Sequence, residues 1–469
     1  MLCKPPAPPL RLQVMNAPTP TAAKLVSGSI PRHLVNQTLP AVIGVAAVMS
    51  IGIVDAYFIG QLGSDALAAI SFIFPIAVAM TSLGVGVMVG INSVVARALG
   101  EGDHERAARR ANFGIVFAAT CGTLMGLMLW MLVDPIFAAM NAPARLMPLI
   151  RAYMEPYAIG FPLILIIMGF NGVLRGQGEA RRTSTISISY AAANWVLDPL
   201  LITGGFGFEG FGMAGAAYAS VIGWGVGVAV AVVLIRSTAL PFNPALLRNC
   251  SLIDPARAII KVGVPAAFSN AINPLGLSIL TALVALEGEA AVAGFGAAGR
   301  LQSFVIVPLL ALSGAIGGIV GQNWGAREFG RAREATLYAA GFCVVWGLTV
   351  AIAMMVAGEQ FARLFTEDPE VIAEFARYLE IAAWGYAGFG LLIVGNGIMN
   401  AVDKASFALL QSVARVFLVM LPTALLLQPG MGSAAIYTAE LAANLFGAVT
   451  AIVLVRHIFV QRAPAWSAS

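Results

Sequence analysis

The stretch NQTLPAVIGVAAVMSIGIVDAYFIG, residues 36–60, decides the fold. A helix that crosses a bilayer needs about 20 predominantly apolar residues, and this stretch is long enough. It lacks the strict alternation of apolar and polar residues that a strand of a membrane barrel requires. It therefore predicts a transmembrane helix, with one carboxylate, Asp55, placed inside it.

The rest of the chain repeats this pattern. Of its 469 residues, 59% are apolar and 11% are charged, whereas about a quarter of a soluble domain is charged. Eleven further apolar segments are found at residues 70–97, 112–133, 151–174, 184–204, 212–235, 260–286, 296–323, 336–357, 374–400, 406–428 and 433–455. We therefore expect an all-α membrane protein with twelve transmembrane helices. This composition argues against a soluble enzyme and against a nucleic-acid binder.

Three polar segments remain outside these helices. Residues 1–35 contain seven prolines and no apolar run of signal-peptide length, so they predict a flexible tail rather than a signal peptide. Residues 236–259 read as a linker, and residues 458–469 as a second tail. With twelve spans both tails lie on one side of the membrane. That side carries 21 of the 27 Lys and Arg residues, which predicts that it is the cytoplasmic side of the plasma membrane.

A shift of 225 residues aligns the two halves of the chain without gaps. The matching pairs include Pro40 with Pro265, Gly63 with Gly288, Gly100 with Gly325, Tyr153 with Tyr378, and Asn171 with Asn396. Each half contains six predicted spans, an even number, so both halves insert the same way up. The sequence thus predicts two lobes, residues 36–235 and 260–457, related by a parallel internal repeat, which is a common plan among transporters.

Ionisable side chains at membrane depth are costly and indicate function. At 1.5 Å per residue, Asp55 and Asp198 both lie roughly 7–9 Å below the outer boundary. Asn194 precedes Asp198 by one turn and shares its helix face, and Ser220 reaches a similar depth. We expect these four residues to bind Na⁺ or a proton, with Pro199 as a hinge that kinks the helix. The alternative is that each aspartate only hydrogen-bonds a neighbouring helix.

Other polar side chains in the spans are weaker candidates. Glu440 is a possible acid of the second lobe, or a structural contact. Arg415 either pairs with an acid or faces the substrate. Tyr153, Asn171 and Asn396 are expected to line the substrate cavity. No sequence pattern calls for a cofactor, and no metal site is expected beyond Na⁺ at the aspartates.

Several motifs in this order resemble the multidrug and toxic compound extrusion (MATE) transporters, of the bacterial and archaeal DinF-like type. They are Pro40, Asp55 and Gly60 to Gly63 in the first span, Gly100-Glu101-Gly102-Asp103, Arg175-Gly176-Gln177-Gly178, Asn194 with Leu197-Asp198-Pro199, and Gly215-Ala216-Ala217-Tyr218-Ala219-Ser220. The resemblance implies an antiporter that exports cationic and amphipathic compounds in exchange for Na⁺ or H⁺. It implies that Asp55, Asn194 and Asp198 form the ion or proton site, and that Tyr153 and Asn171 approach the cavity for the drug.

Three rival interpretations are weighed against this one. A flippase for lipid-linked oligosaccharides has related architecture, but it needs a strongly cationic cavity, and Arg415 alone lies clearly inside a span. A major-facilitator carrier would carry a GxxxDRxGRR loop, which is absent. A membrane-embedded enzyme would need a nucleophile and base or a metal set, and no HExxH or GxSxG motif occurs. We expect a monomer that binds small molecules and the lipid bilayer, and no nucleic acid.

Overall fold

The computed structural model of the protein describes residues 23–205, 207–248, 251–363 and 366–462. These residues are almost entirely helical, with one short hairpin between β1 (Gly204–Gly205) and β2 (Phe208–Glu209). The α-helices are α1 (Ile30–Gly60), α2 (Ser64–Gly100), α3 (His104–Ala139), α4 (Met147–Gly176), α5 (Ala180–Asp198), α6 (Met213–Ile235), α7 (Ile253–Val284), α8 (Glu289–Val305), α9 (Val307–Gly325), α10 (Phe329–Ala362), α11 (Pro369–Ala382), α12 (Tyr386–Ala401), α13 (Ala405–Val413), α14 (Leu421–Met431) and α15 (Ser433–Arg462). Four 3-10 helices, η1 (Ala144–Leu146), η3 (Pro244–Leu247), η4 (Ala285–Glu287) and η5 (Ala383–Gly385), and two π-helices, η2 (Pro199–Thr203) and η6 (Ala414–Met420), complete them.

An all-α membrane fold is confirmed. Within the described ranges, ten helical segments are long and apolar enough to cross a bilayer, and α8 and α9, bent by 41°, make an eleventh if they form one span. The predicted span 184–204 is not among them. It corresponds to α5 and η2, and α5 begins with the polar sequence ARRTSTISIS, which lowers its hydropathy.

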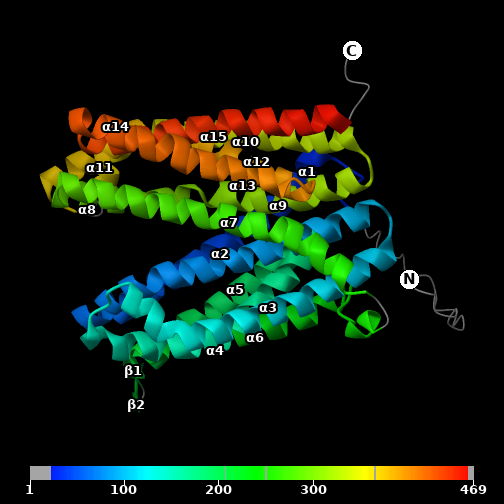
Figure 1. Cartoon of the computed structure of the whole chain (residues 1–469), viewed down its shortest axis with the longest axis horizontal. Coiled ribbons are helices and arrows are strands. Elements are labelled where there is room, and N and C mark those ends of the chain that lie inside the picture. The colour runs from blue at the N-terminus through cyan, green and yellow to red at the C-terminus, as the bar shows by residue number, and fades with distance from the viewer. Residues whose placement is uncertain (1–22, 206, 249–250, 364–365, 463–469) are drawn as a thin grey trace, which may run out of the picture.

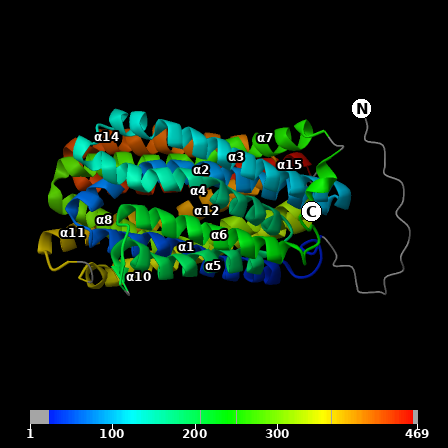
Figure 2. The same cartoon turned by 90° about the horizontal axis from the view of Figure 1, so that it is seen from below.

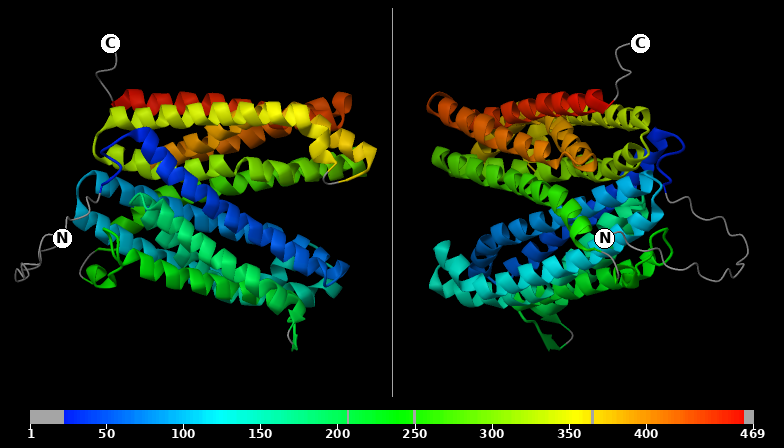
Figure 3. Two further views of the ribbon diagram at one scale, coloured as in Figure 1. Left: turned by 180° about the vertical axis from the view of Figure 1, so that it is seen from behind. Right: turned by 45° about the vertical axis from the view of Figure 1, so that its right-hand side comes forward.

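The helices form two bundles that lie side by side (Figure 1). One bundle holds α2 to α6 and the other holds α7 to α15. Helix α1 crosses between them: Ile30 packs into the second bundle, and Ile59 packs into the first (Figure 3). Viewed from below, most helices run along the same axis, which is the expected arrangement for spans of one membrane (Figure 2).

The two bundles meet through glycines at the end where α2 and α9 terminate. A Cβ on Gly100 would collide with the backbone carbonyl of Gln322, and one on Gly325 would collide with the carbonyl of Arg97. Glycine allows this close approach because it has no side chain. The 225-residue shift converts Gly100 into Gly325 and Arg97 into Gln322, so the two contacts are images of each other.

The 225-residue shift also relates a second pair of contacts between the bundles. Ser93 donates a hydrogen bond of 2.7 Å from Oγ to the carbonyl of Asn400. Its image under the shift is Gly318, where a Cβ would lie 2.5 Å from the carbonyl of Arg175, the image of Asn400. These contacts between the bundles are therefore related by the same 225-residue shift. Away from this end the bundles diverge (Figure 1).

The boundaries of the polar segments differ from the sequence prediction. Residues 1–22 of the predicted tail lie outside the described residues, but Leu25 is buried in the second bundle and α1 begins at Ile30. The Leu25 backbone binds the amide side chains of Gln322 and Asn323, so this part of the predicted tail is anchored. At the other boundaries α7 begins at Ile253, seven residues before the predicted span, and α15 runs on to Arg462.

Candidate functional site

Asp55 and Asp198 come together between α1 and the end of α5. Their carboxyl groups are close enough for their charges to interact, although 143 residues separate them in the chain. Asp198 is 0% exposed. Among the described residues, Oδ1 of Asp55 and both carboxylate oxygens of Asp198 have no hydrogen-bond partner. The first bundle thus holds two neighbouring carboxyl groups, and three of their four oxygens have no partner among the described residues.

The backbone changes helix type directly after Asp198. Helix α5 ends at Asp198, and the π-helix η2 begins at Pro199. Proline has no N–H and clashes with the preceding turn, so one α-helical hydrogen bond is lost at Pro199. Single π-turns inside helices are frequent at functional sites, and they free backbone carbonyls. The sequence predicted a break at Pro199, and the observed form of that break is a π-helix.

Tyr153 of α4 borders the acid pair. The Tyr153 hydroxyl lies near enough to Asp55 and Asp198 to interact with both charges. Its ring stacks on that of Tyr157 at a centroid distance of 5.9 Å, and Tyr157 makes an edge contact with Trp224. Tyr153, predicted to line the substrate cavity, therefore lies beside the acids.

The other predicted members of the first-bundle site are buried, and none makes a side-chain hydrogen bond to Asp55 or Asp198 among the described residues. Asn194 is buried on α5, and neither atom of its side-chain amide has a partner in the described chain. Asn171 on α4 is also buried, with an unpaired carbonyl oxygen. Ser220 is buried on α6, but no hydrogen bond to Asp55 or Asp198 is found among the described atoms.

The second bundle contains a buried acid, Glu440, with a hydrogen-bond partner on each carboxylate oxygen. Glu440 on α15 is 5% exposed. Gln302 donates to its Oε1 at 2.9 Å, and the Tyr378 hydroxyl lies 3.0 Å from its Oε2. The Tyr378 hydroxyl also lies 3.1 Å from the Gln302 carbonyl oxygen, so three side chains from three helices form one network.

Arg415 lies next to this network in the π-helix η6. It donates to the side-chain carbonyls of Asn273 and Asn444, both at 2.8 Å, and it lies over the Phe389 ring at 5.5 Å. Its charge interacts with that of Glu440. Its Nε has no partner in the described part of the chain. The hydrogen-bond partners of Arg415 are therefore side-chain amides, and its role in transport stays a prediction.

Asn396 lies in a different network. Its amide lies 3.3 Å from Ser412 Oγ and 3.4 Å from Ser269 Oγ, and it accepts a hydrogen bond from Gln411. The two serine hydroxyls contact each other at 2.7 Å. Asn396 thus joins α7, α12 and α13, whereas its repeat image Asn171 retains an unpaired oxygen.

These contacts determine what each carboxylate can do. An ionised carboxylate only accepts hydrogen bonds, so two facing carboxylates are stable together only with a proton or a cation between them. Asp55 and Asp198 meet this condition, and the unpaired side-chain oxygen of Asn194, one turn before Asp198, is a further hard ligand. Glu440 has donors already. Within the described ranges no three His, Cys, Asp or Glu residues are grouped as a transition-metal site.

Comparison with known proteins assigns the family. The MatE family model matches the chain twice, at residues 40–200 and 265–426, which together cover more than half of it. The chain belongs to the MATE transporter family. The two matches begin 225 residues apart, at 40 and 265, which is the offset of the internal repeat. This MATE chain is therefore a multi-pass membrane transporter and not an enzyme.

Its relatives include proteins named for different cargoes. The chain is 31% identical over 406 residues to the "FAD transporter" of Shewanella oneidensis, covering 86% of this chain and 89% of that one. It is 25% identical to the "Probable multidrug resistance protein YpnP" of Bacillus subtilis, covering 81% and 84%. A crystal structure of a variant of the Vibrio cholerae MATE transporter VcmN matches with a TM-score of 0.87 and 26% identity, covering 94% and 98%.

Sequence reasoning missed most partners of the second-bundle acid. Gln302 is uncharged and lies on a different helix from Glu440, so no local pattern distinguishes it. Tyr378 could have been found, because the 225-residue shift makes it the image of Tyr153. Each bundle therefore places a tyrosine from equivalent helices beside a buried acid.

Proposed function

We propose that this MATE transporter is a secondary active antiporter that exports cationic and amphipathic compounds in exchange for Na⁺ or H⁺. The observation that carries the proposal is the pair Asp55 and Asp198, neighbouring carboxyl groups with three of their four oxygens unpaired among the described residues. Intramembrane acids of this kind mark ion and proton pathways. The relative named as a probable multidrug resistance protein agrees with this cargo class. We further propose that the chain is of the DinF-like type, since both acids lie in the first bundle.

Coupling follows from competition for the pair's negative charge. Without a bound ion, Asp55 and Asp198 attract a cationic compound. Uptake of Na⁺ or a proton cancels that charge, and the compound leaves on the side from which the ion entered. An ion can drive export only if ion and cargo bind with opposite preference. Asn194 and Ser220 complete the oxygen set, Tyr153 and Asn171 contact the cargo, and Pro199 is the hinge.

Alternating access requires the bundles to separate at one end and close at the other. In our proposal there are twelve spans in two six-helix lobes, with α5 and η2 as the twelfth, because α5 is enclosed by protein more than by lipid. The glycine contacts at Gly100 and Gly325 form the closed end. The arginine-rich side, with both termini, is cytoplasmic, so the divergent end faces outward. Asn396, Arg415 and Glu440 serve the second lobe.

The test is efflux from proteoliposomes with an imposed Na⁺ or pH gradient, each applied separately. We expect Asp55→Asn and Asp198→Asn each to lower gradient-driven export of a cationic dye at least about tenfold, because an amide neither binds a proton nor attracts a cation. Glu155→Gln is the matched control, since Glu155 is an exposed acid of α4. Undiminished gradient-driven export in both aspartate variants would refute the mechanism.

A second cargo class is favoured by one further observation. Arg415 is a buried cation whose Nε has no partner, and a relative is named an FAD transporter. A guanidinium suits a phosphate group, so an anionic flavin dinucleotide is the second candidate. Export of FAD and of a cationic dye from the same vesicles distinguishes the two. If FAD is the cargo, Arg415→Gln lowers FAD export more than dye export when both are compared at equal amounts of folded protein.

A further inference from the structure

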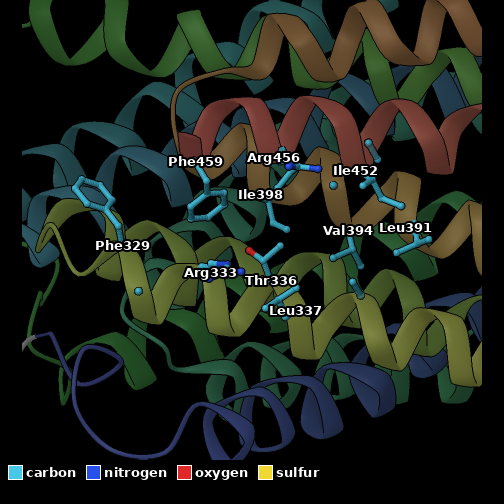
Figure 4. Close-up of a pocket in the computed structure, with 15 residues that line it drawn as sticks. Phe329, Arg333, Thr336, Leu337, Leu391, Val394, Ile398, Ile452, Arg456 and Phe459 are labelled. Carbon is cyan, nitrogen blue, oxygen red and sulfur yellow. The ribbon is translucent and has the colours of Figure 1, made fainter. Parts of the chain in front are cut away.

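A groove lies on the second bundle, outside both networks of polar side chains. Helices α10, α12 and α15 enclose a volume of about 440 Å³. Small-molecule sites range from about 300 to 1,000 Å³, so the groove is large enough for a ligand. Its side chains converge from the three helices, as Figure 4 shows. The residues used below are Phe329, Arg333, Leu337, Ile398, Ile452 and Arg456.

The walls of the groove are apolar and open to the outside of the protein. Its floor is formed by α12, where Ile398 is buried. Its rims are formed by α10 and α15, where Leu337 is 58% exposed and Ile452 is 54% exposed. The side of a transmembrane helix that is exposed at this depth contacts lipid. The medium that fills the groove is therefore hydrocarbon rather than water.

The length of the groove matches one leaflet of a bilayer. On α10 it extends from Phe329 to Ala340, and on α15 from Phe459 to Ala451. At 1.5 Å per residue these distances are about 16 Å and 12 Å. The hydrocarbon core of a bilayer is about 30 Å thick, so one leaflet is about 15 Å. An acyl chain lying along the groove would pass from the interface to near the midplane.

Two arginines stand at the interfacial end of this apolar groove. Arg333 comes from α10 and Arg456 from α15, and both are exposed (Figure 4). They lie within about one turn of Phe329 and Phe459, at the end of the helices where α15 terminates. Two guanidinium groups repel a cationic compound and attract a phosphate. Basic groups between transmembrane helices at this level are typical of sites for anionic lipid head groups.

We propose that this groove binds one anionic glycerophospholipid, with an acyl chain between α10, α12 and α15 and its phosphate on Arg333 and Arg456. The lipid joins α10 to α15 across the face of α12. This site is separate from the cargo site, and the inference does not depend on the nature of the cargo. It applies to the leaflet on the side of both termini.

The test is native mass spectrometry of the purified full-length protein, titrated with phosphatidylglycerol or with phosphatidylcholine of the same acyl chains. We expect the wild-type protein to retain phosphatidylglycerol preferentially. An arginine near a membrane surface increases the affinity for an anionic lipid by up to about tenfold. The double variant Arg333→Gln with Arg456→Gln should therefore weaken binding of phosphatidylglycerol by roughly tenfold or more. The matched control combines Arg236→Gln, directly after α6, with Arg257→Gln on α7. Both arginines are exposed, and this double variant should leave the binding of phosphatidylglycerol unchanged.

A second variant tests the acyl-chain part of the site. Ala340→Trp fills the inner end of the groove and leaves both arginines in place. It should weaken binding of long-chain phosphatidylglycerol and spare a short-chain analogue. Equal retention of the two lipids by the wild-type protein would overturn the proposal. So would full retention by the arginine double variant, or displacement of the lipid by a cationic dye or by inorganic phosphate.

Discussion

The two bundles share a repeat, yet the acids that they contain differ in their hydrogen-bond partners. In the first bundle Tyr153 lies beside Asp55 and Asp198, and three of the four carboxylate oxygens have no partner among the described residues. In the second bundle Tyr378, the repeat image of Tyr153, contacts Glu440, and Gln302 and the charge of Arg415 complete the set. The same scaffold thus carries one acid site that lacks donors and one that has them.

This difference separates a binding site from a structural contact. A buried polar group with its hydrogen bonds made stabilises the fold, whereas one without them costs free energy until a ligand supplies them. The unpaired acids of the first bundle therefore raise the free energy of the folded protein, and binding of an ion or proton lowers it. In the second bundle the Gln302 amide donates to Glu440, and the Arg415 guanidinium lies nearby, so no ion is needed there. The predictions below test this contrast, from the largest expected effect to the smallest.

Removing the cation of the second bundle should destabilise the protein most. Arg415→Ala leaves the Asn273 and Asn444 carbonyls without their donor and Glu440 without a compensating charge. Breaking a buried charge network by removing one partner costs about 3–5 kcal/mol. Thermal unfolding in detergent should show a clear fall in melting temperature. A melting temperature equal to that of the wild-type protein would show that the second-bundle network does not stabilise the fold.

The contact between the bundles should be next in sensitivity. Gly100→Ala and Gly325→Ala each place a Cβ against a backbone carbonyl of the opposite bundle. Overpacking costs about 1–3 kcal/mol, so each variant should shift the protein away from the conformation closed at this end. Distances between spin labels on the two bundles measure the shift. Gly341→Ala on α10 is the control, because nothing lies within 4 Å of its added Cβ. The repeat predicts similar effects at Gly100 and Gly325, and a shift at one alone would contradict it.

The two equivalent tyrosines should differ in their contribution to stability. Tyr378→Phe removes the hydroxyl that contacts Glu440 and Gln302. Hydrogen bonds between transmembrane helices contribute about 0.6–1.7 kcal/mol, and we expect a loss in that range. Tyr153→Phe should cost less, because no hydrogen bond of its hydroxyl is found among the described residues, yet it should alter gradient-driven export. Equal losses of stability in the two variants would remove the contrast between the bundles.

Neutralising the first-bundle acid should have the smallest effect on stability, of opposite sign. Asp198→Asn removes one of two facing carboxyl groups, and with it their mutual repulsion. We expect the melting temperature to stay within a few degrees of the wild-type value or to rise, while gradient-driven export falls. Glu440→Gln provides the comparison and should lower the melting temperature. A strongly destabilised Asp198→Asn protein would mean that this acid is a structural contact.

Much of the fold could be predicted from the sequence, since the length of an apolar run is a local property. The runs that contain α1, α2 and α10 are long and uninterrupted, and the structure has helices there. The shorter and more polar α5 is the exception, because its polar residues face protein, and hydropathy alone cannot reveal such packing. Residues 23–35 were also misread, since composition gives no sign that Leu25 is held by α9.

The charged residues of the candidate site could be predicted from the sequence, but the hydrogen-bond partners of the buried polar side chains could not. Depth counting placed Asp55 and Asp198 at one level, and the structure brings them together. Depth counting could not tell that Asn396 would be held by Ser269, Ser412 and Gln411 while Asn171 keeps an unpaired oxygen. Nor could it assign Gln302 to Glu440, because that contact depends on how α8 and α15 rotate against each other.

The amino-acid sequence by itself determined that this chain is a membrane protein of repeated apolar helices, with a few acids at membrane depth, because hydrophobic length, charge and repeat offset are properties of the chain. Only the tertiary structure decided which acid has donors and which has none. Hydrogen-bond partners inside a membrane come from helices far apart in sequence, and their meeting depends on helix rotation and close packing, which no local pattern records.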